Sequence, residues 1–169
     1  HPSSWGGSDG SDASHPCTLA QAVACINKST YSGTQTLFLT GDVTMSSTSA
    51  FTFEKDSLLT SAGSTPHTIK AGSSSATVSF TVGSTAAAAV TFSNCIVDGA
   101  GYAADHLVSV ANGTFTLGTG ATLRNNASAT YGCGVYVSGS TAKFVIDGGT
   151  ISSCSAGTSG GAVYITSSG

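Results

Sequence analysis

The stretch that decides the fold is residues 144–165, which read Phe144-Val-Ile-Asp-Gly-Gly-Thr-Ile-Ser-Ser-Cys-Ser-Ala-Gly-Thr-Ser-Gly-Gly-Ala-Val-Tyr-Ile165. An earlier part of the chain repeats its apolar residues after a shift of 28 or 29 positions. The matched residues are Phe115 with Phe144, Leu117 with Ile146, Thr122-Leu123 with Thr150-Ile151, and Val135-Tyr136-Val137 with Val163-Tyr164-Ile165. The stretch is therefore one copy of a repeat.

A third copy is expected before these two. It places Thr91-Phe-Ser-Asn-Cys95 on Thr122-Leu-Arg-Asn-Asn126, and Val108 and Val110 on Val135 and Val137. Each copy holds short β-branched or aromatic runs between Gly, Ser and Asn turns, and a unit of roughly 25 to 30 residues cannot bury its apolar face alone. The repeat predicts an all-β fold, a right-handed parallel β-helix in which the copies stack as rungs.

The composition fits such a solenoid. Of the 169 residues, 40% are hydrophobic and only 8% are charged, and Ser, Thr, Gly and Asn suit tight corners and outer strand faces. A net charge of -3 with five basic residues supplies no phosphate-binding stripe, so nucleic acid is not expected as a partner. No apolar run approaches the roughly 18 residues of a membrane span.

Five cysteines and three N-x-Ser/Thr sequons favour a secreted or cell-surface location. The sequons predict N-glycosylation at Asn27, Asn112 and Asn126. Residues 1–16 are expected to form a flexible leader that lacks the basic start and apolar block of a signal peptide.

Residues 17–169 are expected to form a single β-helix domain that opens with a helix over about residues 18–27. Thr18 and Gln21 make a capping box, and an apolar stripe follows on one helix face. The stripe consists of Leu19, Ala22, Val23 and Ile26. Because each end of a solenoid exposes unpaired backbone groups and apolar side chains, the helix is expected to cover the first rung.

The clearest repeats occupy residues 90–169, and the last copy is the best formed. No closing cap is visible after it. We therefore expect stacking to continue through this last rung, onto further rungs, a partner protein or another copy of the chain.

Two motifs carry a resemblance to known β-helix families. An apolar residue with Asn or Cys three positions later is followed by a Gly-x-x-Val turn in the last two copies, as in Leu123–Asn126 with Gly132–Val135 and Ile151–Cys154 with Gly160–Val163. This pattern resembles bacterial surface β-helix proteins, including the polymorphic outer-membrane and adhesin-like families. The helix followed by Leu37-Phe-Leu-Thr-Gly-Asp-Val-Thr44 is similar to the opening of pectin-lyase-like right-handed β-helices.

The resemblance also raises the possibility of an enzyme. Polysaccharide-cleaving enzymes on this fold gather acidic and basic residues on one outer face, so the charged residues of this chain can be checked for such a cluster. Aligning the copies stacks no carboxylate on another, so no catalytic residues are expected. The cluster available to such an enzyme consists of Asp98, Asp105, His106 and Arg124. Asp98 and Asp147 are expected to cap Asp-Gly corners, and Asp98 is expected within reach of Arg124 on the next rung. The four histidines show no metal-ligand spacing, so neither a metal nor a cofactor is expected.

The cysteines are expected to have structural roles. Cys95, Asn126 and Cys154 are predicted to form an inward ladder in which Asn126 bonds buried backbone groups. Rungs about 4.8 Å apart place Cys95 and Cys154 two rungs apart, beyond disulfide reach. Cys17 and Cys25 bracket the helix about 12 Å apart, so any disulfide that they form must have other partners.

Together these features predict an extracellular, non-enzymatic structural or adhesive rod. It would act as an adhesin or as a subunit of a surface filament, self-associating or binding another protein through its last rung, with glycans as further partners. The alternative is a carbohydrate-active enzyme or carbohydrate-binding module on a pectin-lyase-like fold.

Overall fold

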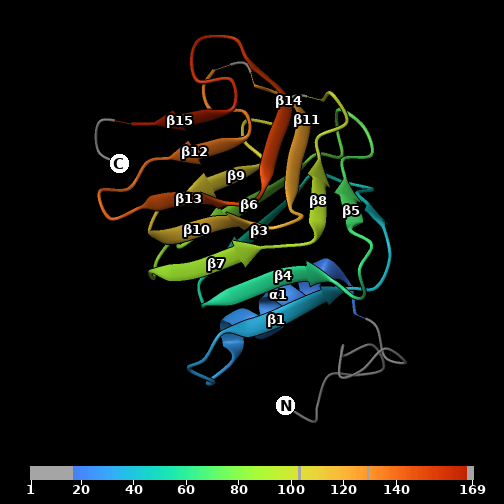
Figure 1. The fold of residues 1–169 in the computed structure, drawn as a ribbon, viewed down its shortest axis with the longest axis vertical. Helices are drawn as coiled ribbons and strands as arrows, with labels where there is room; N and C mark the ends of the chain where they lie inside the picture. The colour runs from blue at the N-terminus through green and yellow to red at the C-terminus, as the bar shows by residue number, and fades with distance from the viewer. Residues whose placement is uncertain (1–16, 103, 129, 167–169) are drawn as a thin grey trace.

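The computed structural model describes residues 17–102, 104–128 and 130–166, so the predicted leader, residues 1–16, lies outside the described part of the chain. The chain winds into five successive coils, and each coil contributes one strand to each of three parallel five-stranded sheets (Figure 1). The predicted parallel β-helix is confirmed.

The three sheets take every third strand. The first sheet consists of β1 (Gln35–Leu39), β4 (Ser57–Ser61), β7 (Ala88–Phe92), β10 (Gly113–Gly118) and β13 (Lys143–Asp147). The second sheet consists of β2 (Val43–Thr44), β5 (His67–Lys70), β8 (Cys95–Asp98), β11 (Thr122–Ser128) and β14 (Thr150–Ala156). The third sheet consists of β3 (Ser49–Phe53), β6 (Val78–Val82), β9 (Val108–Val110), β12 (Val135–Val137) and β15 (Val163–Ile165).

Inward-facing side chains stack in columns along the axis of the β-helix. The column inside the first sheet consists of Leu37, Leu59, Phe92, Leu117 and Ile146. Its first four members are at most 7% exposed. Because each buried CH₂ group contributes about 0.8 kcal/mol, these columns stabilise the stacked coils.

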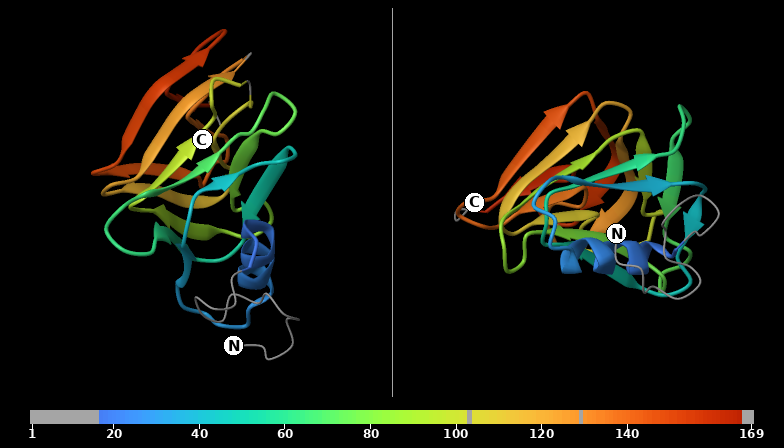
Figure 2. Two further views of the ribbon diagram at one scale, coloured as in Figure 1. Left: turned by 90° about the vertical axis from the view of Figure 1, so that its right-hand side faces the viewer. Right: turned by 90° about the horizontal axis from the view of Figure 1, so that it is seen from below.

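The helix α1 (Leu19–Lys28) covers the N-terminal end of the stack (Figure 2). The Thr18 hydroxyl accepts a hydrogen bond from the Gln21 N–H, and the Gln21 side chain accepts one from the Thr18 N–H, so the predicted capping box is confirmed. Leu19, Val23 and Ile26 are buried in the same core cluster as the first coil. The predicted helical cap is therefore confirmed to within one residue at each end.

The register between the fourth and fifth coils is the predicted one, with Phe115 on Phe144 and Tyr136 on Tyr164. The predicted register of the third coil is correct only at β9, where Val108 pairs with Val135. The expected placement of Thr91 on Thr122 is wrong. Thr91 pairs with Thr116 instead.

This error arose because two corners resemble each other locally. Asn94 and Asn125 both adopt the left-handed conformation, with φ of 43° and 53°, which Asn tolerates better than most residues. Asn94 precedes β8, however, whereas Asn125 lies inside β11. The two Asn-containing runs are therefore similar in sequence but occupy different places in their coils.

Candidate functional site

The last coil, β13 to β15, presents the apolar interior of the β-helix to solvent. Leu117 is fully buried, but Ile146, which stacks on it, is 56% exposed. Val137 is 1% exposed, and Ile165 above it is 58% exposed. The two residues of each pair are similarly apolar. Their exposed fractions differ because no described residue lies over the last coil.

The backbone of the last coil is also open. Strands β13, β14 and β15 are the edge strands of their sheets, so one row of N–H and C=O groups in each strand lacks a ladder partner within the described chain. Figure 1 shows these three strands at the end opposite to α1. Such an edge is a template for another parallel strand.

Rows of stacked aromatic rings reach the same end. On the outer wall of the third sheet, His106 stacks on Tyr136 with ring centroids 4.3 Å apart, and Tyr136 stacks on Tyr164 at 5.9 Å. Inside the first sheet, Phe144 stacks on Phe115 at 5.6 Å. Both rows follow the coil-to-coil direction, so a further coil could continue them.

Carboxylates near the N-terminal end of the β-helix bond backbone groups of the coil that follows. Glu54, after β3, accepts hydrogen bonds from the N–H groups of Ser84, Thr85 and Ala86, after β6. Asp56 accepts one from the Ala89 N–H at 2.8 Å. These carboxylates are thus engaged by backbone N–H groups of the next coil.

Asp42 follows the same rule, accepting a hydrogen bond from the Thr68 N–H at 2.8 Å and lying 3.4 Å from His67 Nδ1. The Thr68 N–H lowers the pKa of Asp42, and His67 adds to this effect. Asp147 lies at the end of β13 in the last coil, where it is exposed, and no described coil follows it.

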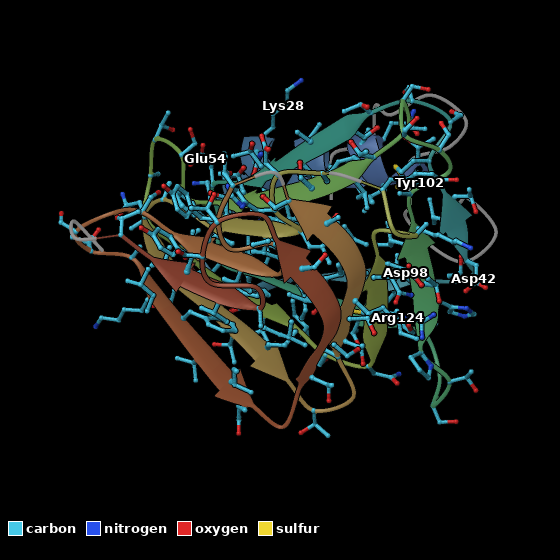
Figure 3. All side chains as sticks on the ribbon, turned by 90° about the horizontal axis from the view of Figure 1, so that it is seen from above. Lys28, Asp42, Glu54, Asp98, Tyr102 and Arg124 are labelled. Atoms are coloured by element: carbon cyan, nitrogen blue, oxygen red, sulfur yellow. The ribbon has the colours of Figure 1, made fainter. Side chains whose placement is uncertain are left out.

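Asp98 and Arg124 form the most polar cluster on the outer wall. Arg124 Nε donates to Asp98 Oδ2 at 2.7 Å, and the Asn125 side chain and the Ala100 N–H also donate to the Asp98 carboxylate. Figure 3 shows Asp98 and Arg124 side by side. The predicted turn cap and ion pair are confirmed. Asp98 is only 4% exposed, whereas the Arg124 side chain is 39% exposed, so the carboxylate alone is more buried than expected.

The environment of Asp98 keeps its carboxylate charged. Burial raises the pKa of Asp98. The hydrogen bonds from Ala100, Arg124 and Asn125, together with the charge of Arg124, lower it by more than burial raises it, so the net shift is downward. A carboxylate held in this way is a poor general acid, which must carry a proton near neutral pH.

An open hollow of about 510 Å³ lies beside this cluster. It crosses the second sheet, and its polar lining includes Lys70, Asp98, Asn125, Ser153 and Ser155. The sequence analysis did not identify Lys70, because the register that places it beside Asp98 was not visible in the repeat.

The other two residues of the predicted cluster lie elsewhere. His106 Nδ1 is 3.0 Å from the Gly132 carbonyl oxygen and its ring stacks on Tyr136, whereas Asp105 is exposed. The structure thus brings Asp98 and Arg124 together but does not add Asp105 and His106 to them. Among the described residues, no group of three or more His, Cys, Asp and Glu side chains could hold a metal ion.

Asn126 occupies the inward position that was predicted for it. Its amide donates to the Ala104 and Cys133 carbonyl oxygens at 3.0 and 2.8 Å, and its partner on the next coil is Cys154. The predicted place of Cys95 in this ladder is wrong, because Cys95 pairs with His67 at the start of β8. Cys17 and Cys25 are half-buried and are not joined to each other.

The three sequons differ in access. Asn126 is 2% exposed, so the prediction of glycosylation at this position is wrong for the folded chain. The Asn27 amide donates to the Thr52 carbonyl oxygen, a bond that a glycan would disturb. Asn112 is half-buried and uses its side-chain oxygen to accept a hydrogen bond from Thr141, so glycosylation there stays a prediction.

No family model, curated protein or solved structure matches the chain. No helix among the described residues is long and apolar enough to cross a membrane.

Proposed function

We propose that this chain is a non-enzymatic, extracellular segment of a structural or adhesive β-solenoid rod, closed at one end by α1 and extended at the other by further parallel coils. The observation that carries the proposal is the exposed apolar interior of the last coil, with Ile146 and Ile165 more than half exposed. The resemblance of the repeat to bacterial surface β-helix proteins agrees with this role.

The occupant of the open end is a further coil in parallel register. All three ladders are parallel, and the carboxylates of Asp42, Glu54 and Asp56 each bond the coil after their own. Asp147 is available to do the same for a sixth coil. Another copy cannot offer its first coil to this end, because α1 covers that coil, so head-to-tail stacking of this chain into a filament is not expected.

A coil-duplication experiment tests this proposal. A second copy of residues 141–169 is fused after Gly169, and amide hydrogen exchange is measured in β13 to β15 of the original coil. We expect exchange there to slow at least about tenfold, because the edge N–H groups and the apolar columns become covered.

The matched control carries Asp at the positions of Ile146 and Ile165 in the added copy only, and we expect it to give no protection. Unchanged exchange with the unaltered copy would refute the proposal. Negative-stain imaging of native material provides a second test, because rods longer than five coils, about 24 Å at 4.8 Å per coil, are expected.

The polar hollow on the second sheet favours carbohydrate binding as a second candidate function. Lys70, Asn125 and Ser153 line the hollow with polar groups along the axis of the β-helix, which suits an extended polyhydroxylated ligand. Calorimetric titration with soluble oligosaccharides tests this candidate. Binding should be lost in Lys70→Ala and kept in Lys143→Ala, since Lys143 lies on the first sheet; no binding, or equal binding by both variants, would exclude the hollow.

A further inference from the structure

Cys133 is held against Asn126 in the turn before β12. Its Sγ donates to the Asn126 carbonyl oxygen at 3.0 Å, and its own carbonyl oxygen accepts from the Asn126 amide at 2.8 Å. Cys133 is fully buried. These two hydrogen bonds fix both its backbone and its side chain.

Cys154 lies above Asn126 on the last coil. It is the register partner of Asn126 on β14, and paired strands are about 4.8 Å apart. The Cys133 side chain interacts with the Cys154 thiol and with the Ser155 N–H. Asn126 thus bonds Cys133 on the fourth coil and pairs with Cys154 on the fifth, which places both cysteines beside the same residue at the boundary between these coils.

We propose that Cys133 and Cys154 form a disulfide under oxidising conditions, fastening the last coil covalently to the coil before it. Such a bond needs close Cβ atoms and Cα atoms within about 7 Å, and the shared neighbour Asn126, which bonds Cys133 and pairs with Cys154, brings the two cysteines close to each other. The Cys95 and Cys154 pair fails this condition, since Cys95 lies on the third coil.

The oxidant is a low-molecular-weight disulfide, RSSR. The Cys154 thiol attacks one sulfur of RSSR and releases one RSH, leaving a mixed disulfide on Cys154. The Cys133 thiol then loses its proton and attacks the Cys154 sulfur, and the second RSH leaves. Two protein thiols are oxidised and one RSSR is reduced to two RSH, so electrons and protons balance.

The order of these steps follows from access. Burial, and secondarily the neighbouring Cys154, raises the pKa of Cys133 to about 12, which disfavours the thiolate that would start the exchange. Cys154 lies on the open last coil and is half-buried. The accessible thiol thus reacts first, and the buried thiol resolves the mixed disulfide.

Peptide mapping of the folded chain tests the proposal. The protein is incubated with oxidised glutathione, remaining thiols are alkylated, and the chain is digested with trypsin without reduction. Cys133 and Cys154 fall in separate peptides, 125–143 and 144–169, and Cys95 falls in a third, 71–124. We expect a cross-link between the first two peptides that reductant removes.

The functional readout is the thermal midpoint of the last coil. The disulfide should raise it by about 5–10 °C over the reduced protein, and Cys133→Ser or Cys154→Ser should abolish this rise, while Cys25→Ser keeps it. Absence of the cross-link in the folded chain, or its appearance only after unfolding in urea, would overturn the proposal. The map uses the chain alone, so it does not depend on whether further coils extend the rod.

Discussion

At the N-terminal end of the β-helix the inward-facing Leu37 and Leu39 are 7% and 4% exposed, whereas at the C-terminal end Ile146 and Ile165 are 56% and 58% exposed. Both ends carry large aliphatic residues on short parallel strands. The N-terminal end has α1 in its core cluster, and the C-terminal end has no described residue above it. Coverage of the end of the stack, and not residue type, therefore decides how much a position there contributes to stability.

The largest difference in stability is expected between substitutions at the two ends of one column. Leu37→Ala should lower the free energy of unfolding by about 3 kcal/mol, since it leaves a cavity between α1 and the coils. Ile146→Ala at the other end should cost less than about 1 kcal/mol, because most of that side chain is already in water. Urea unfolding of both variants measures the difference, and equal losses would show that the last coil is covered in solution.

A second matched pair compares one inward position on neighbouring coils. Asn126→Ala should cost about 2 kcal/mol, because the Ala104 and Cys133 carbonyl oxygens lose their amide donor inside the core. Cys154→Ala, its partner on the last coil, should cost less than about 1 kcal/mol when measured with reductant present. If the two variants were equally stable, Asn126 would not be needed to satisfy these carbonyl groups.

The sequence predicted the fold wherever the coils have similar lengths. Successive members of the column Leu37, Leu59, Phe92, Leu117 and Ile146 lie 22, 33, 25 and 29 positions apart. A fixed shift therefore aligns the last two coils and fails earlier, because both the corners and the strands of the second sheet differ in length between the earlier coils.

The candidate site was less predictable than the fold. The Asp98 and Arg124 contact was predicted, because it joins residues that a shift of about one coil brings together. Cys133 was not identified as a neighbour of Cys154, because its place depends on the path of a turn that holds no periodic apolar residue. Turn geometry of this kind is set by tertiary hydrogen bonds, such as those from Asn126, and not by local propensity.

The third prediction contrasts an interior carboxylate with one on the last coil. Asp98→Asn should cost about 1 kcal/mol at pH 7, whereas Asp147→Asn should leave stability unchanged. The folded pKa of Asp98 lies below its unfolded value. Its contribution is therefore fully present above the unfolded pKa of about 3.9 and is lost as the pH falls through the folded pKa.

Urea unfolding between pH 7 and pH 2.5 checks this contrast. The stability gap between the unaltered chain and Asp98→Asn should narrow below about pH 4. A gap that stays constant over this range would mean that the carboxylate charge of Asp98 contributes nothing, and that only the hydrogen-bonding geometry, which Asn can partly retain, matters.

The smallest effect is expected at the helix that closes the N-terminal end. Thr18→Ala removes the hydroxyl that accepts from the Gln21 N–H and should cost about 1 kcal/mol, while Thr18→Ser should recover most of it. Thr158→Ala, an exposed position on the last coil, should stay within about 0.5 kcal/mol of the unaltered chain. A neutral Thr18→Ala would show that α1 is held by its apolar face alone. The contrast between the two ends would then rest on hydrophobic burial, and capping would add nothing to it.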